Sequence, residues 1–130
     1  MQDILIPATA ETPEVKFLYS THTLSITGES YPENAMVFYA PLRGGLHDYL
    51  AQVSEQAKIE AHFSLKYFNS SSTKLLRSLI SLLNDAARAG KKITAHWYHD
   101  PEDDMMMEFG HDLQDEFGTL ELNVTPFEPA

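Results

Sequence analysis

The clearest chemistry in the sequence lies in four consecutive hydroxyl side chains, Ser70-Ser71-Ser72-Thr73. They follow an alternating apolar segment and open a strongly periodic helical one. The first turn of a helix has unpaired backbone N–H groups and the positive end of the helix dipole, so it stabilises an anion. A phosphate on one of these hydroxyls would be tolerated by the fold and would add about −1.5 to −2 charges at one surface point. The pattern thus indicates a regulatory phosphorylation site.

A helix cap is the simpler interpretation of the same residues. Ser70 or Ser71 would N-cap the helix and contribute about 1 kcal/mol to its stability. One hydroxyl is enough for a cap, whereas the sequence places four in a row. The residues alone leave both interpretations open, because hydroxyl-rich helix starts are common.

Histidines and carboxylates offer no comparable site along the chain. His96 and His99 lie three residues apart on a predicted strand and would point to opposite faces, so we predict no metal site. The acids at 102–104 stand at the start of a predicted helix, where they favour its dipole. The sequence contains no G-x-S-x-G, glycine-rich phosphate loop or H-E-x-x-H motif. We therefore predict no catalytic residues, no cofactor and no enzymatic activity.

A further alternative uses the polar face of the predicted sheet. A ligand-binding module or small acidic enzyme there would be built around His62, Ser64, His96 and Tyr98. Such a module predicts a saturable thermal shift with a nucleotide or a metal ion.

The strands that must position the hydroxyl cluster follow from hydrophobic alternation. Alternating apolar and polar residues predict five strands, at 14–19, 23–27, 58–67, 92–98 and 119–124. The first two are close enough to form a hairpin. Residues 1–13 and 125–130 show little periodicity, and we expect both segments to be loosely ordered.

The helices follow from apolar residues at three- and four-residue steps. This spacing predicts one helix over 75–87, directly after the hydroxyl cluster, and another over 105–117. A further helix is predicted to begin at Ser30, with Glu33 at capping-box spacing. Pro41 and the glycine pair after it predict that this helix is kinked or divided into two.

The predicted order is β-β-α-β-α-β-α-β, a single α/β domain over residues 1–130 with right-handed crossovers between parallel strands. Each later strand has one apolar and one polar face. A doubly wound sheet would bury both faces, so its strands would read as continuous apolar runs. We therefore predict a mixed five-stranded sheet with helices packed mainly on one face.

The composition disfavours several function classes. The chain has 130 residues, a hydrophobic fraction of 43% and a net charge of −10, from 19 acidic and 9 basic residues. The negative electrostatic field of such a chain disfavours nucleic acid and anionic membrane as partners, and it would steer a basic protein surface toward this chain. No apolar run approaches the roughly 20 residues of a membrane helix, and no signal-peptide pattern stands at the start. With no cysteine, these features indicate a cytoplasmic protein.

Two helix-opening motifs resemble those of a known family. Ser30-Tyr31-Pro32-Glu33-Asn34 opens one predicted helix, and Tyr67-Phe68-Asn69-Ser70-Ser71-Ser72 opens the next. Together with Trp97 late in the fourth strand, they resemble the SiaC family of bacterial regulatory phosphoproteins over nearly the whole chain. The resemblance implies a fold like that of the STAS domains of anti-sigma factor antagonists.

The resemblance also implies roles for individual residues. Ser70, directly after Asn69, would be phosphorylated by a serine/threonine protein kinase and dephosphorylated by a PP2C-type phosphatase. Asn69, Ser71 and Ser72 would shape the turn around the phosphate, and Lys74, one turn into the helix, would pair with it. The partner-binding surface would include Tyr31, Pro32, Glu33 and Asn34.

The implied function is a switch. The unphosphorylated form would bind and activate a GGDEF-domain diguanylate cyclase, raising cyclic di-GMP and promoting biofilm formation, and phosphorylation would switch binding off. The alternative is a STAS-type antagonist that binds an anti-sigma factor kinase. Those antagonists carry Asp-Ser-Ser-Gly at this junction, whereas this chain carries Asn69-Ser70-Ser71-Ser72. The difference weakens the alternative and leaves open which serine is modified.

Overall fold

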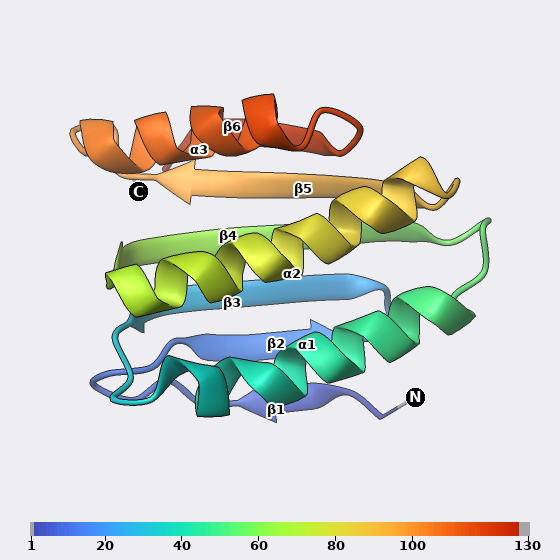
Figure 1. Ribbon diagram of the computed structural model, residues 1–130, viewed down its shortest axis with the longest axis horizontal. Helices are drawn as coiled ribbons and strands as arrows, with labels where there is room; N and C mark the ends of the chain where they lie inside the picture. Colours follow the sequence, from blue (N-terminus) through green and yellow to red (C-terminus); the bar gives the residue numbers. More distant parts are fainter. Residues whose placement is uncertain (1, 128–130) are drawn as a thin grey trace.

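The computed structural model describes residues 2–127, which form a six-stranded sheet covered on one face by three helices (Figure 1). The strands are β1 (Ile4–Ile6), β2 (Glu14–Leu18), β3 (Thr23–Ser30), β4 (Lys58–Phe68), β5 (Lys92–His99) and β6 (Glu121–Pro126). The helices are α1 (Ala35–Gln52), α2 (Ser70–Arg88) and α3 (Asp104–Glu116). The mixed α/β class and the one-sided packing of the helices are confirmed.

The order of the strands in the sheet is the order in the sequence, β1 to β6. β2 pairs antiparallel with both β1 and β3, whereas β3, β4, β5 and β6 pair in parallel. Each parallel step is made by a helix that crosses the same face of the sheet (Figure 1). All three helices therefore begin at one edge, on the left of Figure 1, beside the carboxyl ends of the parallel strands.

The prediction of five strands was wrong. β1 lies within the segment expected to be loosely ordered, and it adds a sixth strand through Ile4 opposite Phe17 and Ile6 opposite Val15. A three-residue strand is too short to show a period of two, so its pairing rather than its own sequence defines it. At the other end, β6 continues to Pro126, while residues 128–130 of the predicted loose tail lie outside the described residues. The likeness to STAS domains stays a prediction.

The predicted division of the first helix into two was wrong, because α1 is one continuous helix with Pro41 inside it, and the kink at Pro41 stays a prediction (Figure 1). Pro41 is exposed, so water can hydrate the carbonyl that its missing N–H leaves unpaired. The helix is capped by Asn34, whose side chain accepts a hydrogen bond from the Val37 backbone N–H at 3.2 Å. Ser30 is therefore not the capping residue: it ends β3 and is fully buried.

The hydrophobic core lies between the sheet and the helices. Trp97 on β5 is completely buried at its centre, and its indole N–H donates to the Met106 carbonyl of α3 at 3.0 Å. The alternate residues of β4 and β5 face away from the helices and remain partly or fully exposed. Within residues 2–127, no helix has the length and apolar character needed to cross a bilayer.

Candidate functional site

The hydroxyl cluster lies at the start of α2, one residue after the end of β4. Asn69 is the N-cap, and its side chain accepts a hydrogen bond from the Ser72 backbone N–H at 3.0 Å. Ser70 is the first residue of the helix and is exposed to solvent. The first helical position has an unpaired N–H and lies at the positive end of the dipole. The local geometry thus suits a phosphate on Ser70.

The hydroxyls of this cluster are not equivalent. Ser72 is fully buried, and its hydroxyl donates to the Ser30 carbonyl at 3.1 Å. The Ser72 hydroxyl also lies 2.9 Å from that of Ser30, which in turn lies 2.6 Å from the Tyr39 phenol. Thr73 donates its hydroxyl to the Asn69 carbonyl at 3.2 Å. Because a kinase needs an exposed hydroxyl, the cluster offers it Ser70 or Ser71, which is also exposed.

The buried Ser30–Tyr39–Ser72 network joins three elements beneath the site. Burial raises the pKa of the Tyr39 phenol, although its hydrogen bonds with Ser30 and Ser72 act in the opposite direction. The phenol therefore stays neutral and can donate to Ser30 while Ser72 donates to the backbone. Every polar group in the network has a partner, so it fixes the start of α2 against the end of β3.

The predicted partner-binding residues lie beside the predicted phosphoacceptor. The Asn69 backbone N–H donates to the Ser30 carbonyl at 3.0 Å, which holds the two strand–helix junctions together. Tyr31 packs edge-on against Tyr67 with ring centroids 5.8 Å apart, and both rings are partly exposed.

The other predicted residues divide between exposed and buried positions. Glu33 and Asn34 are exposed, with Asn34 capping α1, whereas Pro32 is buried. Lys74 is exposed and lies one helical turn after Ser70, on the same side of α2. The predicted residues therefore lie at the two neighbouring strand–helix junctions or in the first turns that follow, where Ser72 and Pro32 are buried and the others are at least partly exposed.

Sequence reasoning missed several exposed apolar side chains near the same edge. Tyr67 is 51% exposed although the alternation of β4 had placed it with the core residues. Met36 and Val37, in the first turn of α1, are 64% and 68% exposed. Both fall outside the stripe of buried residues that faces the sheet, which is the signal that could have identified them.

The start of α3 completes this edge. Asp103 is its N-cap and accepts a hydrogen bond from the Met106 backbone N–H at 3.1 Å, and Asp104 follows in the first turn. The interpretation of these acids as helix-start residues is confirmed. The apolar spacing that predicted a helix over 105–117 counted Met105 among the apolar residues of one face, but Met105 is 81% exposed while Met106 is buried. α3 begins at Asp104, directly after the Asp103 cap and one residue before the predicted start at 105.

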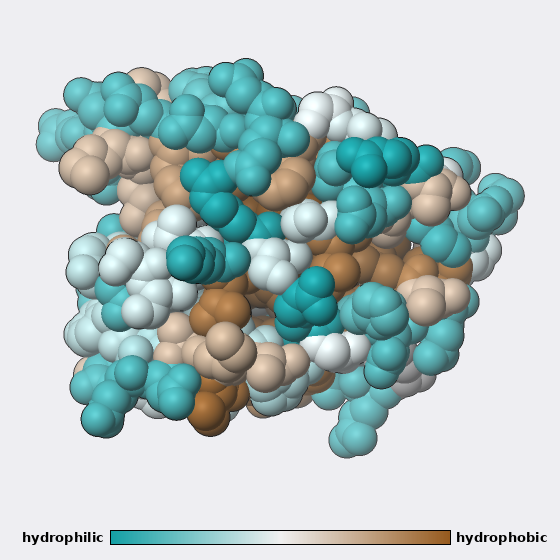
Figure 2. Space-filling view, in the orientation of Figure 1, coloured by the Kyte–Doolittle hydropathy of each residue, from teal (hydrophilic) through white to brown (hydrophobic). Residues whose placement is uncertain are grey.

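Exposed apolar side chains thus lie at the same end of the sheet as the exposed Ser70. We define the docking edge as Tyr31, Met36, Val37 and Tyr67. In Figure 2 the surface at the left, where α2 begins, is mostly white; brown and tan atoms lie beside a teal cluster where α1 begins, and the surface of α3 above is largely teal. Such a surface beside a modifiable hydroxyl is typical of regulatory protein-binding domains.

The family assignment agrees with this class. A family model described as SiaC family regulatory phosphoprotein matches residues 6–127, and the chain belongs to this family. A curated relative, an uncharacterised protein of Pseudomonas aeruginosa strain UCBPP-PA14, is 28% identical over 116 residues. That alignment covers 89% of this chain and 90% of the relative.

Solved structures match over nearly the whole chain. The crystal structure of apo-SiaC from Pseudomonas aeruginosa is 26% identical with a TM-score of 0.87, covering 96% of this chain and 99% of that one. SiaC in the crystal structure of the diguanylate cyclase SiaD with its activator SiaC, from the same organism, is 25% identical with a TM-score of 0.88. The match covers 96% of this chain and 100% of that one.

Proposed function

We propose that this chain is a non-enzymatic regulatory phosphoprotein whose unphosphorylated form binds and activates a diguanylate cyclase. A serine/threonine protein kinase phosphorylates Ser70, and this phosphorylation switches binding off. A PP2C-type phosphatase removes the phosphate and restores binding. One observation carries the proposal: the exposed Ser70 opens α2 beside the exposed Tyr31–Tyr67 pair, while Ser72 is buried and bonded. The SiaC structure in complex with the cyclase SiaD supports the choice of partner.

The physical basis of the switch is desolvation. A docking edge of aromatic and apolar side chains binds a partner by excluding water. A phosphate within that edge would have to lose its hydration, and a doubly charged group resists this strongly. In the free protein the phosphate stays hydrated and is stabilised by the α2 dipole and by Lys74. Modification is therefore compatible with the fold and incompatible with the complex.

The assignment of Ser70 is tested by intact mass after co-expression with the cognate kinase. The wild-type chain will gain one phosphate, Ser70→Ala will gain none, and Ser71→Ala will be modified like the wild type. Ser71 is the matched control because it is the adjacent exposed hydroxyl on the same helix turn. If Ser70→Ala is still modified at wild-type stoichiometry, Ser70 is not the phosphoacceptor.

The aromatic pair provides a second test. Tyr31→Ala and Tyr67→Ala will each weaken binding to the cyclase by at least about tenfold, because aromatic side chains at an interface centre carry much of its energy. Leu5→Ala is the control: Leu5 is 64% exposed but lies on β1, at the far side of the sheet from β4. Isothermal titration calorimetry measures all three. Equal losses in the three variants would contradict the placement of the docking edge.

A pull-down from native lysate separates the proposed partner from the anti-sigma factor kinase of the alternative reading. Recovery of a GGDEF-domain protein with the unmodified chain supports the proposal. Recovery of an anti-sigma kinase in its place would favour the STAS-type antagonist. The family assignment supports the first outcome.

A further inference from the structure

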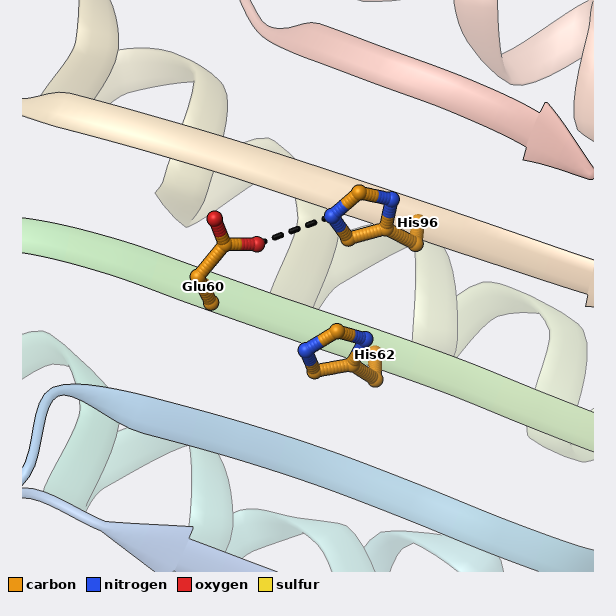
Figure 3. A group of neighbouring side chains, drawn as sticks. All are labelled: Glu60, His62 and His96. Atoms are coloured by element: carbon orange, nitrogen blue, oxygen red, sulfur yellow. Dashed lines mark hydrogen bonds and ion pairs between the residues drawn. The ribbon is translucent and has the colours of Figure 1, made fainter.

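A second group of chemically active side chains lies on the open face of the sheet, away from the helices (Figure 3). Glu60 and His62 extend from β4, and His96 extends from the neighbouring β5. Each offers one nitrogen or oxygen atom that lies within 4.8 Å of those offered by the other two. Two imidazoles and a carboxylate at this separation are a set of metal ligands.

The pairing of the two strands brings these residues together. His62 is directly opposite His96 in the parallel ladder, and Glu60 precedes His62 by two residues and so shares its face. The Glu60 carboxylate lies 2.8 Å from His96 Nε2. The two rings are stacked, with centroids 4.9 Å apart and planes at 9°. Both rings have a nitrogen on the side of Glu60 in Figure 3.

Tyr98 orients the histidine that is not bonded to Glu60. His62 Nδ1 lies 3.0 Å from the Tyr98 hydroxyl. When Nδ1 donates its hydrogen to this hydroxyl, the lone pair of the ring is on Nε2, free for a metal ion. A hydrogen bond of this kind on the outer nitrogen is the usual partner of a metal-bound histidine.

We propose that Glu60, His62 and His96 bind a divalent transition-metal ion of the zinc type. Imidazole and carboxylate ligands suit Zn²⁺, Ni²⁺ and Cu²⁺, whereas Mg²⁺ and Ca²⁺ prefer oxygen ligands alone. The Glu60 carboxylate and His96 Nε2 share a hydrogen bond at 2.8 Å, so a metal ion would replace the hydrogen between them and release it to solvent, and His62 would complete the set of ligands. Three protein ligands leave a fourth position for water or for a partner's side chain.

The prediction of no metal site was argued from His96 and His99 along one strand. These two do point to opposite faces, since His99 is buried while His96 lies on the open face. The ligand partner of His96 is instead its neighbour across the sheet. Because the site lies on the face opposite the helices, it is independent of the Ser70 switch.

Isothermal titration calorimetry with Zn²⁺ and Ni²⁺ tests the site, using the full chain with any purification tag removed. The wild type will bind one ion with a Kd below about 100 µM. His62→Gln, His96→Gln and Glu60→Gln will each weaken metal binding by about tenfold or more. Tyr98→Phe will weaken it by less, because Tyr98 only orients His62. His111→Gln, at an exposed histidine of α3, is the control and will bind like the wild type.

Two further measurements decide between a built site and surface histidines. Excess Mg²⁺ will not displace Zn²⁺, and in NMR spectra the imidazole signals of His62 and His96 will shift together while those of His111 stay unchanged. Glu60→Gln changes an exposed side chain, so its loss of binding cannot be attributed to misfolding. The proposal would be overturned if the wild type did not bind Zn²⁺, or if the variant with both His62→Gln and His96→Gln bound it as tightly as the wild type.

Discussion

Ser70→Asp will weaken binding to the diguanylate cyclase by about 100-fold or more, and enzymatic phosphorylation of Ser70 will weaken it further. A loss of 100-fold corresponds to about 2.7 kcal/mol, and burying an unpaired carboxylate at an interface costs at least that much. The phosphate carries up to twice the charge of the aspartate, so its effect is larger. Ser70→Ala will bind like the wild type, because the interface then loses only a small hydroxyl.

The same substitutions will appear in the activity of the cyclase. Cyclic di-GMP synthesis measured with a fixed amount of cyclase will rise with added wild-type chain or Ser70→Ala. It will stay at the basal rate with Ser70→Asp at the same concentrations. The affinity measured by calorimetry and the turnover of the cyclase are therefore expected to fall together. A fall in turnover at unchanged affinity would instead indicate a loss of activation after binding.

A charge-matched control is available at the opposite end of α1. Ser54 is exposed, and its hydroxyl accepts a hydrogen bond from the Gln56 backbone N–H at 3.1 Å, a role that aspartate can also take. Ser54→Asp adds the same charge to the chain as Ser70→Asp but places it far from the helix starts. It will bind within about twofold of wild type, since single surface charges contribute little at a distance. Wild-type affinity in Ser70→Asp would remove the switch mechanism.

Periodicity was sufficient to predict the elements around the site but not the state of each side chain. The strands and helices that carry Ser70 follow from alternating and helical patterns within the chain itself. Whether Ser72 is exposed depends instead on Ser30, which lies far away in the sequence and is bonded to it in the buried network. A run of similar hydroxyls contains no local signal for that difference.

Contacts between strands explain the remaining differences. Ile4–Ile6 becomes a strand because the edge of β2 accepts it, and the histidine pair on β4 and β5 exists because the parallel register aligns His62 with His96. Neither register can be read from one segment alone, since a shift of one residue would move each side chain to the other face. The position of Ser70 was predictable because it depends on one strand end and one helix start.

The packing of α3 on the core leads to the largest expected change in stability. A Cβ atom added at Gly110 would lie 2.6 Å from Trp97 Cδ1 and 2.9 Å from a methyl carbon of Val124. The indole cannot turn aside freely, because it is completely buried and its N–H is bonded to Met106. Gly110→Ala therefore forces α3 away from the sheet, at a cost of about 1–3 kcal/mol.

A second helical glycine provides the matched control for this substitution. Gly44, inside α1, is exposed, and a Cβ atom there would meet nothing within 4 Å. Gly44→Ala will raise the free energy of unfolding by about 0.5–1 kcal/mol, because alanine loses less backbone entropy in a helix. In thermal denaturation followed by circular dichroism, Gly110→Ala will lower Tm by about 5–10 °C and Gly44→Ala will raise it by a few degrees. The effect of a Gly→Ala substitution on stability thus has opposite signs in the two helices, because only at Gly110 does the buried tryptophan occupy the space that the methyl group needs. A rise in Tm for both variants would show that α3 does not pack this closely on Trp97.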